Sequence, residues 1–402
     1  MPSPSPSPPP PLPPPTANVL WVAPDGRDDP ARGSANAPLR TLAHACARAQ
    51  AGFTIRLTAG EFRETAQCAL RWGVRVRGNG RAGASCTVIH APASWDFRGD
   101  GVADNDAGYV ILAKDVQNVT VDGIAFFGNA NRANGALRII NAQTVVLRDL
   151  SVFDMKNGTY SMEVGTDKMA VDHNWFRNTW TALQNYGDQS TRIRDLTVFS
   201  NVVENISMRF IGLKGRVENL RVFGNTVYLG PGGGQSYFVT LGRNNGSRNW
   251  LIANNVIVGS PANPVSSRQL VVAYESATAP RDVQVRNNVY RDIGLNVVIG
   301  DAPADPATYN LQFVNNLNAD PSLPTTGSEA FQPPANSPVI DRGDPAIGVR
   351  STFIGAGATS ARSSAASRPG APARARPPAS PTCGRRRPRC VRKPSWMQLT
   401  WI

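Results

Sequence analysis

The sequence has few cysteines, few aromatic residues and no long apolar run. Five cysteines among 402 residues are too few for a disulfide framework. No run of about 18 apolar residues occurs, so no segment is predicted to span a membrane. The three histidines are scattered and no Cys/His spacing is typical of zinc, so we expect no transition-metal site. With 7% aromatic residues and 36 glycines, the composition suits an elongated solenoid better than a globule.

Acidic residues are also missing from residues 351–402, where most of the excess positive charge lies. The chain carries a net charge of +13, and ten basic residues fall in this stretch, so 13 minus 10 leaves +3 for the rest. The ten are Arg362, Arg368, Arg374, Arg376, Arg385, Arg386, Arg387, Arg389, Arg392 and Lys393. Because the charge is segregated in this way, we do not expect nucleic acid as a partner of the folded part.

One short sequence motif, which we call the phrase, recurs between residues 169 and 317. Its copies are VDHNWF (171–176), VFSNVV (198–203), VFGNTV (222–227), IANNVI (252–257), VRNNVY (285–290) and FVNNLN (313–318). One asparagine holds the same place in each copy: Asn174, Asn201, Asn225, Asn255, Asn288 and Asn316. Two earlier copies place Ile124 and Leu150 there. Subtracting neighbouring positions gives intervals of 26, 24, 27, 24, 30, 33 and 28 residues, a period typical of stacked repeats.

Each phrase is predicted to form a β-strand, because apolar and β-branched residues alternate along it. No helix-length amphipathic segment separates the copies, which argues against leucine-rich and βαβ architectures. The remaining solution is a parallel β-helix, in which each coil hydrogen-bonds to the next. The asparagines are then expected to form a structural ladder, since stacked amides can donate and accept along the axis and Asn tolerates left-handed backbone at tight corners.

The chain divides into three parts. Residues 1–16 are a Pro-rich linker, in which PSPSPSPPPPLPPP favours extended polyproline. Residues 17–349 are the predicted β-helix domain, and residues 350–402 are a Pro/Ala/Arg-rich tail that we interpret as disordered or out of frame. The alternative for the tail is a segment that binds polyanions, in which case its deletion would abolish binding. Met1 opens no signal peptide, and we expect the natural chain to begin upstream; a free Pro-rich end is the alternative.

The domain is predicted to begin with a strand at 18–26 and a helix at 37–50. Pro38 suits the first helical turn, and an apolar stripe of Leu39, Leu42, Ala43 and Cys46 follows at helical spacing. Such a helix would cover the open end of a solenoid. Cys46 is expected to be buried on this helix, whereas Cys68 and Cys86 flank the first coil and are a candidate pair.

These segments carry a family resemblance. LWVAPDG (20–26), PLRTLAHACARA (38–49), AGFTIRLTAGEFRE (51–64) and VRVRGNG (74–80) resemble the N-terminal cap and first coil of secreted right-handed β-helix proteins of the pectin-lyase-like superfamily. NADPSL (318–323) and NSPVIDRGD (336–344) resemble its closing segment. The resemblance implies an all-β right-handed parallel β-helix and a secreted or cell-surface protein, which we expect to be a monomer. It leaves activity open, because the superfamily holds lyases, hydrolases, epimerases and non-catalytic surface proteins.

A second column of strands lies between the asparagine phrases, and alternation divides its residues between two faces. Met162, Val164, Ile211, Leu213, Val239, Leu241, Val272 and Tyr274 are predicted to point inward. Glu163, Asn185, Lys214, Thr240 and Glu275 are predicted to line an outer groove, with Arg209, Arg216 and Arg243 at its margins. Coils about 4.8 Å apart would let such a groove follow an extended glycan.

This groove predicts a lyase that acts on an acidic, uronate-containing polysaccharide by β-elimination. Lys214 is the candidate base, because neighbouring cations favour a neutral amine. Arg243 and Arg209 would neutralise the substrate carboxylate. Tyr186 would assist the reaction, although the alternation predicts that its side chain points inward. Glu163, Asn185, Tyr186, Arg216 and Glu275 are the candidate substrate-binding residues. The competing interpretation is a set of solvated charges on a non-catalytic carbohydrate-binding or structural β-helix.

Other features support weaker hypotheses. A hydrolase would need two carboxylates about 5 to 9.5 Å apart, for which Glu163 with Asp188 or Asp167 with Asp172 are candidates. Calcium, which several relatives use, is a candidate ion for the insertion at 92–108, whose ligands would be Asp96, Asp100, Asp104 and Asp106; a solvated loop is the favoured alternative. Trp95, Trp180 and Tyr160 are candidates for stacking on sugar rings. His173 resembles a pectate-lyase motif residue but is interpreted as structural.

Overall fold

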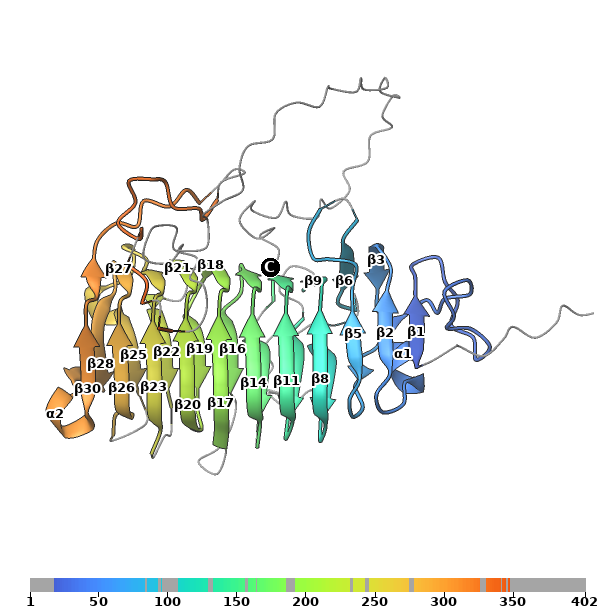
Figure 1. Ribbon diagram of the computed structural model, residues 1–402, viewed down its shortest axis with the longest axis horizontal. Helices are drawn as coiled ribbons and strands as arrows, with labels where there is room; N and C mark the ends of the chain where they lie inside the picture. Colours follow the sequence, from blue (N-terminus) through green and yellow to red (C-terminus); the bar gives the residue numbers. More distant parts are fainter. Residues whose placement is uncertain are drawn as a thin grey trace, which may run out of the picture.

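The computed structural model describes residues 18–347, except 84, 93–94, 96–107, 129–132, 156–157, 164, 186–191, 232–233, 243–245, 275–277, 326–329, 341 and 345. The described strands form three stacked sheets, and from β2 to β28 consecutive strands of the chain enter the three sheets in turn (Figure 1). All strand pairs are parallel except β28 with β29. This is a parallel β-helix, as the repeat predicts.

The three sheets are named sheet 1, sheet 2 and sheet 3. Sheet 1 contains β1 (Val19–Val22), β2 (Thr54–Leu57), β5 (Arg75–Arg77), β8 (Gln117–Asp122), β11 (Gln143–Arg148), β14 (Asp167–Asp172), β17 (Arg192–Phe199), β20 (Arg216–Phe223), β23 (Arg248–Ala253), β26 (Arg281–Arg286) and β30 (Leu311–Val314). Sheet 2 contains β3 (Gly60–Arg63), β6 (Thr87–His90), β9 (Ile124–Phe127), β12 (Ser151–Phe153), β15 (Trp175–Arg177), β18 (Val202–Ile206), β21 (Thr226–Leu229), β24 (Val256–Val258), β27 (Val289–Arg291) and β31 (Leu317–Asn318). Sheet 3 contains β4 (Cys68–Ala69), β7 (Tyr109–Lys114), β10 (Gly135–Ile140), β13 (Gly158–Glu163), β16 (Thr181–Asn185), β19 (Arg209–Leu213), β22 (Ser236–Leu241), β25 (Arg268–Ala273), β28 (Gly294–Ile299) and β29 (Ala302–Pro303).

The core is one continuous column of apolar side chains between the three sheets. Equivalent residues of successive coils lie in register, as Val145, Met169 and Leu196 do on sheet 1. Each of these side chains is buried. Because every coil contacts only its neighbours, this stacked column rather than a central globule supplies the hydrophobic stabilisation.

The six repeated asparagines lie at the corner between sheets 1 and 2 and hydrogen-bond from coil to coil. Asn225 shows the pattern: its Nδ2 donates to Asn255 Oδ1 at 2.9 Å and to the Val198 carbonyl at 3.0 Å. Its own Oδ1 accepts from the backbone N–H and the Nδ2 of Asn201, at 3.0 and 2.9 Å. Asn225 is 1% exposed. Water therefore cannot replace these partners.

The left-handed backbone at this corner belongs to the residue before each asparagine, not to the asparagine as expected. Positive φ occurs at His173, Ser200, Gly224, Asn254, Asn287 and Asn315. A second set of left-handed Asn and Asp residues lies at exposed corners, where Asn205 Nδ2 donates to Asn178 Oδ1 at 2.8 Å. Short polar side chains suit these positions because they tolerate positive φ and bond locally.

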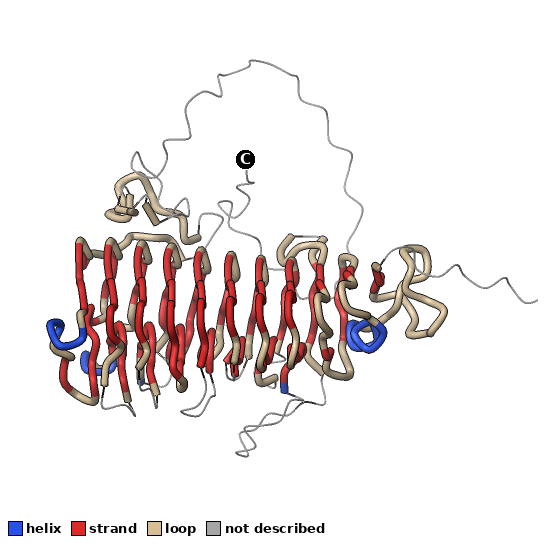
Figure 2. Tube along the Cα trace, turned by 60° about the horizontal axis from the view of Figure 1, so that its bottom comes forward, coloured by secondary structure: helices blue, strands red, loops and turns tan. Residues whose placement is uncertain are grey.

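Two short helices lie near the two ends of the stack (Figure 2). Helix α1 (Leu42–Arg48) is shorter than the predicted 37–50, because Thr41 caps it by accepting a hydrogen bond from the His44 N–H. Leu42, Ala45 and Cys46 are buried in the core. Helix α2 (Pro306–Tyr309) precedes β30, and a 3-10 turn, η3 (Val265–Ser267), precedes β25. No helix among the described residues is long and apolar enough to cross a membrane.

Helix α1 is tied to sheet 3 by a disulfide between Cys46 and Cys68. The expected pairing of Cys68 with Cys86 is therefore wrong. The helix takes the place of a strand beside β4, which brings its buried Cys46 next to Cys68. Sequence position alone did not reveal that this helix face meets the first strand of sheet 3.

The segment after β31 turns back across the outer face of sheet 2, where Figure 1 shows it in orange. Phe331 joins a buried cluster with Phe153, Trp175 and Val202, and Leu323 and Val339 join another with Val256 and Val289. Further on, Asp344 and Asn254 exchange hydrogen bonds of 2.8 and 3.1 Å. The closing segment thus buries apolar side chains that point outward from sheet 2.

We expect the Asn225→Ala variant to lose roughly 1 to 3 kcal/mol of unfolding free energy, because the Val198 carbonyl and the Asn201 N–H lose buried partners. Chemical denaturation measures this loss. The control is Gln284→Ala on the exposed face of β26, which should change stability by less than about 0.5 kcal/mol. Equal stability of the two variants would contradict a structural role for the asparagine column.

Candidate functional site

Sheet 3 presents aligned side chains on its outer face. The register places Gln184 beside Gly212, Gly212 beside Thr240 and Thr240 beside Val272. Leu213 and Leu241 occupy the adjacent inward row and are 1% exposed. Met162, Ile211 and Val239 are also buried, so the predicted alternation is confirmed for these strands.

The alternation was wrong in β25. Val272 shares the outward row of Thr240, and Tyr274 is 43% exposed, although both were predicted to point inward. Val271 and Ala273 fill the inward positions instead. A shift of one residue moves every side chain of a strand to the other face, so this shift brings Tyr274 to the surface of sheet 3.

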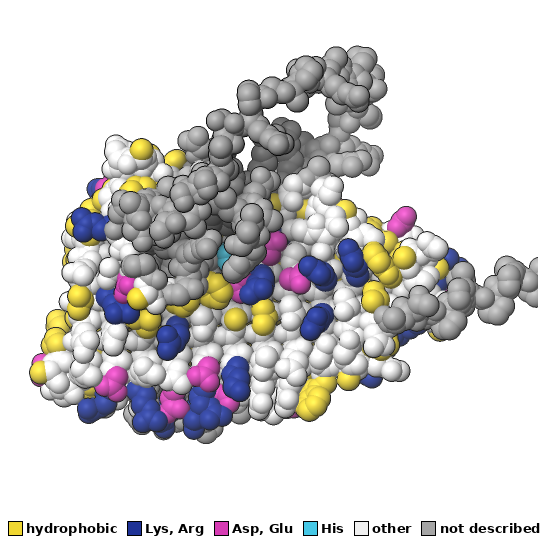
Figure 3. Space-filling model, viewed as in Figure 1, with side chains coloured by type: hydrophobic (Ala, Val, Ile, Leu, Met, Phe, Trp, Pro, Cys, Tyr) yellow, Lys and Arg dark blue, Asp and Glu magenta, His cyan; other side chains and the backbone are white. Residues whose placement is uncertain are grey.

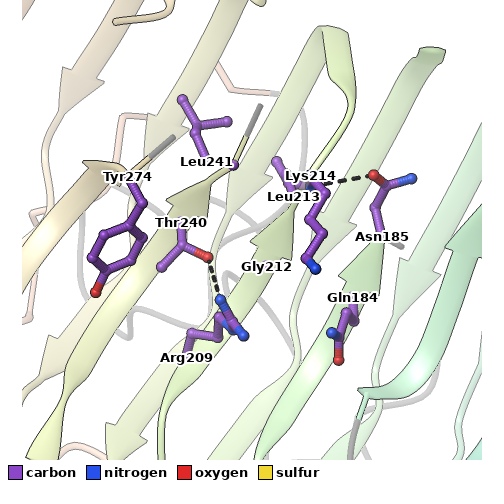
Figure 4. A pocket seen from close by; sticks show the side chains of 10 residues that line it. Gln184, Asn185, Arg209, Gly212, Leu213, Lys214, Thr240, Leu241 and Tyr274 are labelled. Atoms are coloured by element: carbon purple, nitrogen blue, oxygen red, sulfur yellow. Dashed lines mark hydrogen bonds between the residues drawn. The ribbon is translucent and has the colours of Figure 1, made fainter. Parts of the chain in front are cut away.

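A small, shallow pocket lies on this face (Figure 4). The pocket is lined by residues of β16, β19 and β22, by the residues that directly follow β19 and β22, and by Tyr274, which directly follows β25. These residues are Gln184, Asn185, Arg209, Gly212, Leu213, Lys214, Thr240, Leu241, Gly242 and Tyr274. The pocket therefore contains two of the predicted cations, Arg209 and Lys214, together with a tyrosine that sequence reasoning had assigned to the core.

Arg209 crosses the pocket because Gly212 leaves room for it. A Cβ at Gly212 would lie 2.9 Å from both Cδ and Nε of Arg209. The guanidinium group donates from Nη1 to Thr240 Oγ1 at 3.1 Å and from Nε to Thr181 Oγ1 at 3.2 Å. Two hydroxyl groups on flanking strands thus hold the guanidinium over the floor of the pocket.

Lys214 lies on the opposite side of the pocket, over a second glycine. A Cβ at Gly242 would lie 3.2 Å from Cα and 3.3 Å from Cγ of Lys214. The Lys214 backbone N–H donates to Asn185 Oδ1 at 3.2 Å, and the neighbouring Gly215 N–H donates to the same oxygen at 2.7 Å. In Figure 4 the amine of Lys214 extends toward the pocket between Gly212 and Gln184.

Tyr274 forms the far end of the pocket. Its ring meets that of Tyr237 edge-on, with centroids 5.6 Å apart and planes at 79°. Partial burial raises the pKa of Tyr274, and the hydroxyl group of Tyr237 raises it further, while Arg209 acts in the opposite direction. The Tyr274 phenol therefore keeps its proton at neutral and moderately alkaline pH.

Three predicted binding residues have other surroundings. Asn185 was expected to point outward but is fully buried in the inward row, where its Nδ2 donates to the Met162 carbonyl at 2.7 Å. Glu163 binds Arg138 through two hydrogen bonds of 2.9 and 3.0 Å. Arg216 begins β20 on sheet 1 and pairs with Glu218. Asn185 therefore positions the backbone of Lys214, and Arg216 lies outside the pocket.

Glu218 is the centre of a cluster of charges at the start of sheet 1. Besides Arg216, it contacts Arg192 at 3.0 Å and Arg248 at 3.2 Å. Figure 3 shows basic and acidic side chains mixed along this edge. Because acids are interspersed with the arginines, this edge is an ion-pair network rather than a purely basic surface.

Several predicted residues lie outside the described part of the chain. Of the candidate site residues these are Arg243, Tyr186 and Glu275; the inward candidate Val164, the hydrolase candidate Asp188 and the calcium candidates Asp96, Asp100, Asp104 and Asp106 are also among them. Their roles stay predictions. Among the described residues there is no group of three or more His, Cys, Asp or Glu side chains that could hold a metal ion.

The second hydrolase pair does not have the required geometry. Asp167 and Asp172 lie at the two ends of β14, about 16 Å apart at 3.3 Å per residue, which exceeds the separation that glycosidases use. Each also binds an arginine: Asp167 binds Arg194, and Asp172 binds Arg148 at 2.7 Å. The Nδ1 of His173 lies 2.8 Å from Asp172 Oδ1, so His173 belongs to the hydrogen-bond network of this buried carboxylate.

The three aromatic candidates for sugar stacking differ in exposure. Trp180 is 42% exposed, whereas Trp95 is partly buried against the core. Tyr160 is fully buried and meets Phe176 edge-on at 5.2 Å. Stacking of Tyr160 on a sugar is therefore ruled out, because its ring belongs to the core.

The comparisons with known proteins bear on the fold. No family model and no curated protein sequence matches the chain. Among solved structures, PfbA, a surface adhesin of Streptococcus pneumoniae, is 13% identical, with 70% of this chain and 75% of that chain covered and a TM-score of 0.50. The chain has the right-handed parallel β-helix fold of the pectin-lyase-like proteins.

Two further solved structures are similar in fold. The enzymatically active domain of tailspike protein 2 from bacteriophage CBA120 is 11% identical, with 68% of this chain and 39% of that chain covered and a TM-score of 0.49. An alginate lyase from Paenibacillus sp. is 13% identical, with 69% and 96% covered and a TM-score of 0.42. At such identities the likeness concerns the fold alone.

We expect Tyr160→Phe to raise the unfolding free energy by about 1 kcal/mol, because the buried Tyr160 hydroxyl has no hydrogen-bond partner among the described residues. Burial also raises the pKa of Tyr160. The unfolded chain therefore releases this proton first, above about pH 10, and stability falls there as pH rises. Denaturation of the variant should show a shallower alkaline loss than wild type. The control is Tyr309→Phe, which removes a partly exposed phenol. A Tyr160→Phe protein that is less stable than this control would contradict the prediction.

Proposed function

We propose that this protein is a polysaccharide lyase that cleaves a uronate-containing glycan by β-elimination on the outer face of sheet 3. One observation carries the proposal. Arg209 and Lys214 flank a single pocket floored by Gly212 and Gly242, and Tyr274 closes its far end. This reaction requires a group that neutralises the carboxylate, a base and an acid. In this proposal the cation Arg209, the amine of Lys214 and the phenol of Tyr274 fill these three roles.

In the proposed reaction the amine of Lys214 removes the C5 proton of a uronate residue. The electron pair moves toward the carboxylate, and the guanidinium of Arg209 stabilises the added negative charge. The pair then forms the C4–C5 double bond as the C4–O bond breaks. The phenol of Tyr274 gives its proton to the departing oxygen, and the lysine proton returns to the tyrosine through solvent.

Tyr274 suits the role of proton donor better than that of base. A phenol with a raised pKa remains protonated during turnover and can donate a hydrogen bond to the leaving oxygen. Lys214 is placed by its own backbone bond to Asn185, which is fixed inside the coil. The acid and the base thus belong to different coils on either side of the glycosidic bond.

The surroundings of the pocket suit an extended polymer. Strands of sheet 3 stack about 4.8 Å apart, so outward side chains of successive coils can contact successive sugar units. Lys214 and Tyr274, on two sides of the pocket, are both exposed to solvent and can be reached by a polymer. We propose a secreted or cell-surface location, which fits a polymeric substrate.

The first test is absorbance at the ultraviolet wavelength of unsaturated uronyl products. The full chain is incubated with alginate, polygalacturonate and glycosaminoglycans, with and without calcium. We expect Lys214→Ala to lower the rate by roughly 10² to 10⁴-fold, because it removes the base. Lys114→Ala is the matched control, since Lys114 ends β7 on the same sheet and is exposed away from the pocket.

Other outcomes of this test lead to other functions. New reducing ends without ultraviolet absorbance would indicate a hydrolase. Glycan binding with no change in chain length would favour the alternative of a non-catalytic surface protein, which the similarity to a surface adhesin supports. Equal rates for the Lys214→Ala and Lys114→Ala variants would remove Lys214 from the mechanism.

We expect Tyr274→Phe to lower kcat by about 100-fold and to leave KM nearly unchanged, because only the proton is lost while the ring stays. Kinetics on the glycan found in the first test measure both constants. Tyr309→Phe, on helix α2, is the control for loss of a partly exposed phenol. If kcat is unaffected by Tyr274→Phe, another group protonates the leaving oxygen.

A further inference from the structure

The outer face of sheet 3 continues past the pocket toward the last coils. In the row that contains Arg209, the register places Tyr237 beside Arg209, Gln269 beside Tyr237 and Gly294 beside Gln269. Tyr237 also contacts Tyr274, the end of the pocket. A polymer that passes Arg209 and Tyr274 along the axis therefore reaches Gln269 next.

Two side-chain amides converge over Gly294, and we call them the amide pair: Gln269 and Asn296. A Cβ at Gly294 would lie 2.2 Å from Gln269 Oε1 and 3.1 Å from Asn296 Oδ1. The Oε1 of Gln269 thus occupies the position that a side chain of residue 294 would take, and Asn296 Oδ1 lies beside it. The Nε2 of Gln269 donates to the Val265 carbonyl at 3.3 Å, which directs the oxygen toward this position.

Both oxygens are buried and neither has a hydrogen-bond donor within the described part of the chain. A carbonyl oxygen withdrawn from water without a donor raises the free energy of the protein. Two such acceptors side by side are complementary to a ligand that brings hydroxyl groups. Hydroxyl donors would satisfy both.

The surroundings of the amide pair select a neutral ligand. Its charged neighbour Arg268 is bound to Asp292 at 3.4 Å, so this cation is already compensated. Amide oxygens without a carboxylate are a weak site for a divalent cation, which favours charged oxygen ligands. Tyr274 offers a partly exposed ring, and the apolar face of a sugar ring can stack on it.

We propose that the amide pair and Tyr274 bind a neutral, hydroxyl-rich sugar unit, so that the substrate is a heteroglycan in which uronates alternate with neutral sugars. This inference rests on the proposed function, because it concerns the same groove. Gln269 and Asn296 lie two and three coils beyond Arg209, about 10 to 14 Å along the axis. A uronate held by Arg209 would thus be followed, further along the chain, by an uncharged sugar at the amide pair.

Affinity measurements on the full chain test the inference independently of cleavage. The probes are short fragments of two kinds: hyaluronan and gellan fragments, in which a uronate alternates with or is joined to neutral sugars, and alginate and polygalacturonate fragments, in which every unit is a uronate. Isothermal titration with Lys214→Ala protein prevents turnover. We expect the mixed fragments to bind at least about tenfold more tightly.

Two variants test the amide pair itself. Gln269→Leu removes one acceptor, and Gly294→Ala keeps both amides but places a Cβ where the Gln269 oxygen lies. We expect each to abolish the preference for mixed fragments while uronate fragments bind as before. Gln284→Leu, on the exposed face of sheet 1, is the matched control and should change nothing. The melting curve of Gly294→Ala should match wild type, because the displaced atoms end a flexible side chain. Gln269→Leu should melt at or above the wild-type temperature, because it removes a buried acceptor that has no donor.

The outcomes separate the two proposals. Binding of uronate fragments without a preference for mixed ones, or a preference that survives both Gln269→Leu and Gly294→Ala, overturns the amide-pair inference and leaves the lyase proposal in place. Absence of binding to every fragment overturns the proposed function, and the inference with it. A preference lost in both variants and kept in Gln284→Leu supports the inference.

Discussion

Polar groups buried in one coil depend on partners in the next coil, and this constraint holds the structure together. No coil can bury its own apolar face or satisfy its own backbone, because both lie open at the top and bottom of the coil. The asparagine column meets this constraint at the corner between sheets 1 and 2, where Asn225 links Asn201 to Asn255. Since equivalent amides bond in six successive coils, axial register is fixed there. The alignment of outward side chains on sheet 3 follows from that register, so the pocket depends on a column on the other side of the core.

The pocket arises from missing side chains rather than from a bend of the chain. A regular β-sheet presents an even layer of side chains, and a glycine removes one member of that layer. Gly212 lets Arg209 lie flat and reach Thr240 across the strands, and Gly242 does the same for the stem of Lys214. Long cations held along the sheet in this way lose less freedom when they bind a ligand than cations that extend into solvent. The third glycine, Gly294, leaves space for two amides by the same means.

The fold could be predicted from the sequence because one physical requirement recurs in every coil and leaves the same phrase each time. The site was harder, because it depends on single strands. Alternation placed Ile211, Leu213 and Lys214 correctly, yet it failed in β25, where Leu270, Val271, Val272 and Ala273 are all apolar and no polar residue marks the outer face. Tyr274 was therefore assigned to the core. Asn185 failed for another reason: a buried amide that bonds the Lys214 N–H looks in sequence like an outward polar residue.

The order of side chains along sheet 3 gives the groove a direction. At one end Glu163 and Arg138 neutralise each other; Arg209 and Lys214 follow two coils later, then the two tyrosines, and then neutral amides. Among the described residues of sheet 3, Arg209 and Lys214 share one pocket, whereas Arg138 and Arg268 pair with Glu163 and Asp292. A groove for a uniformly charged polymer would be expected to repeat a cation at the polymer's own spacing, since each carboxylate gains from a partner of its own. A groove with one cationic pocket flanked by uncharged hydrogen-bonding groups instead favours a chain whose charge is equally uneven, and it fixes which unit of that chain stands at the reacting groups.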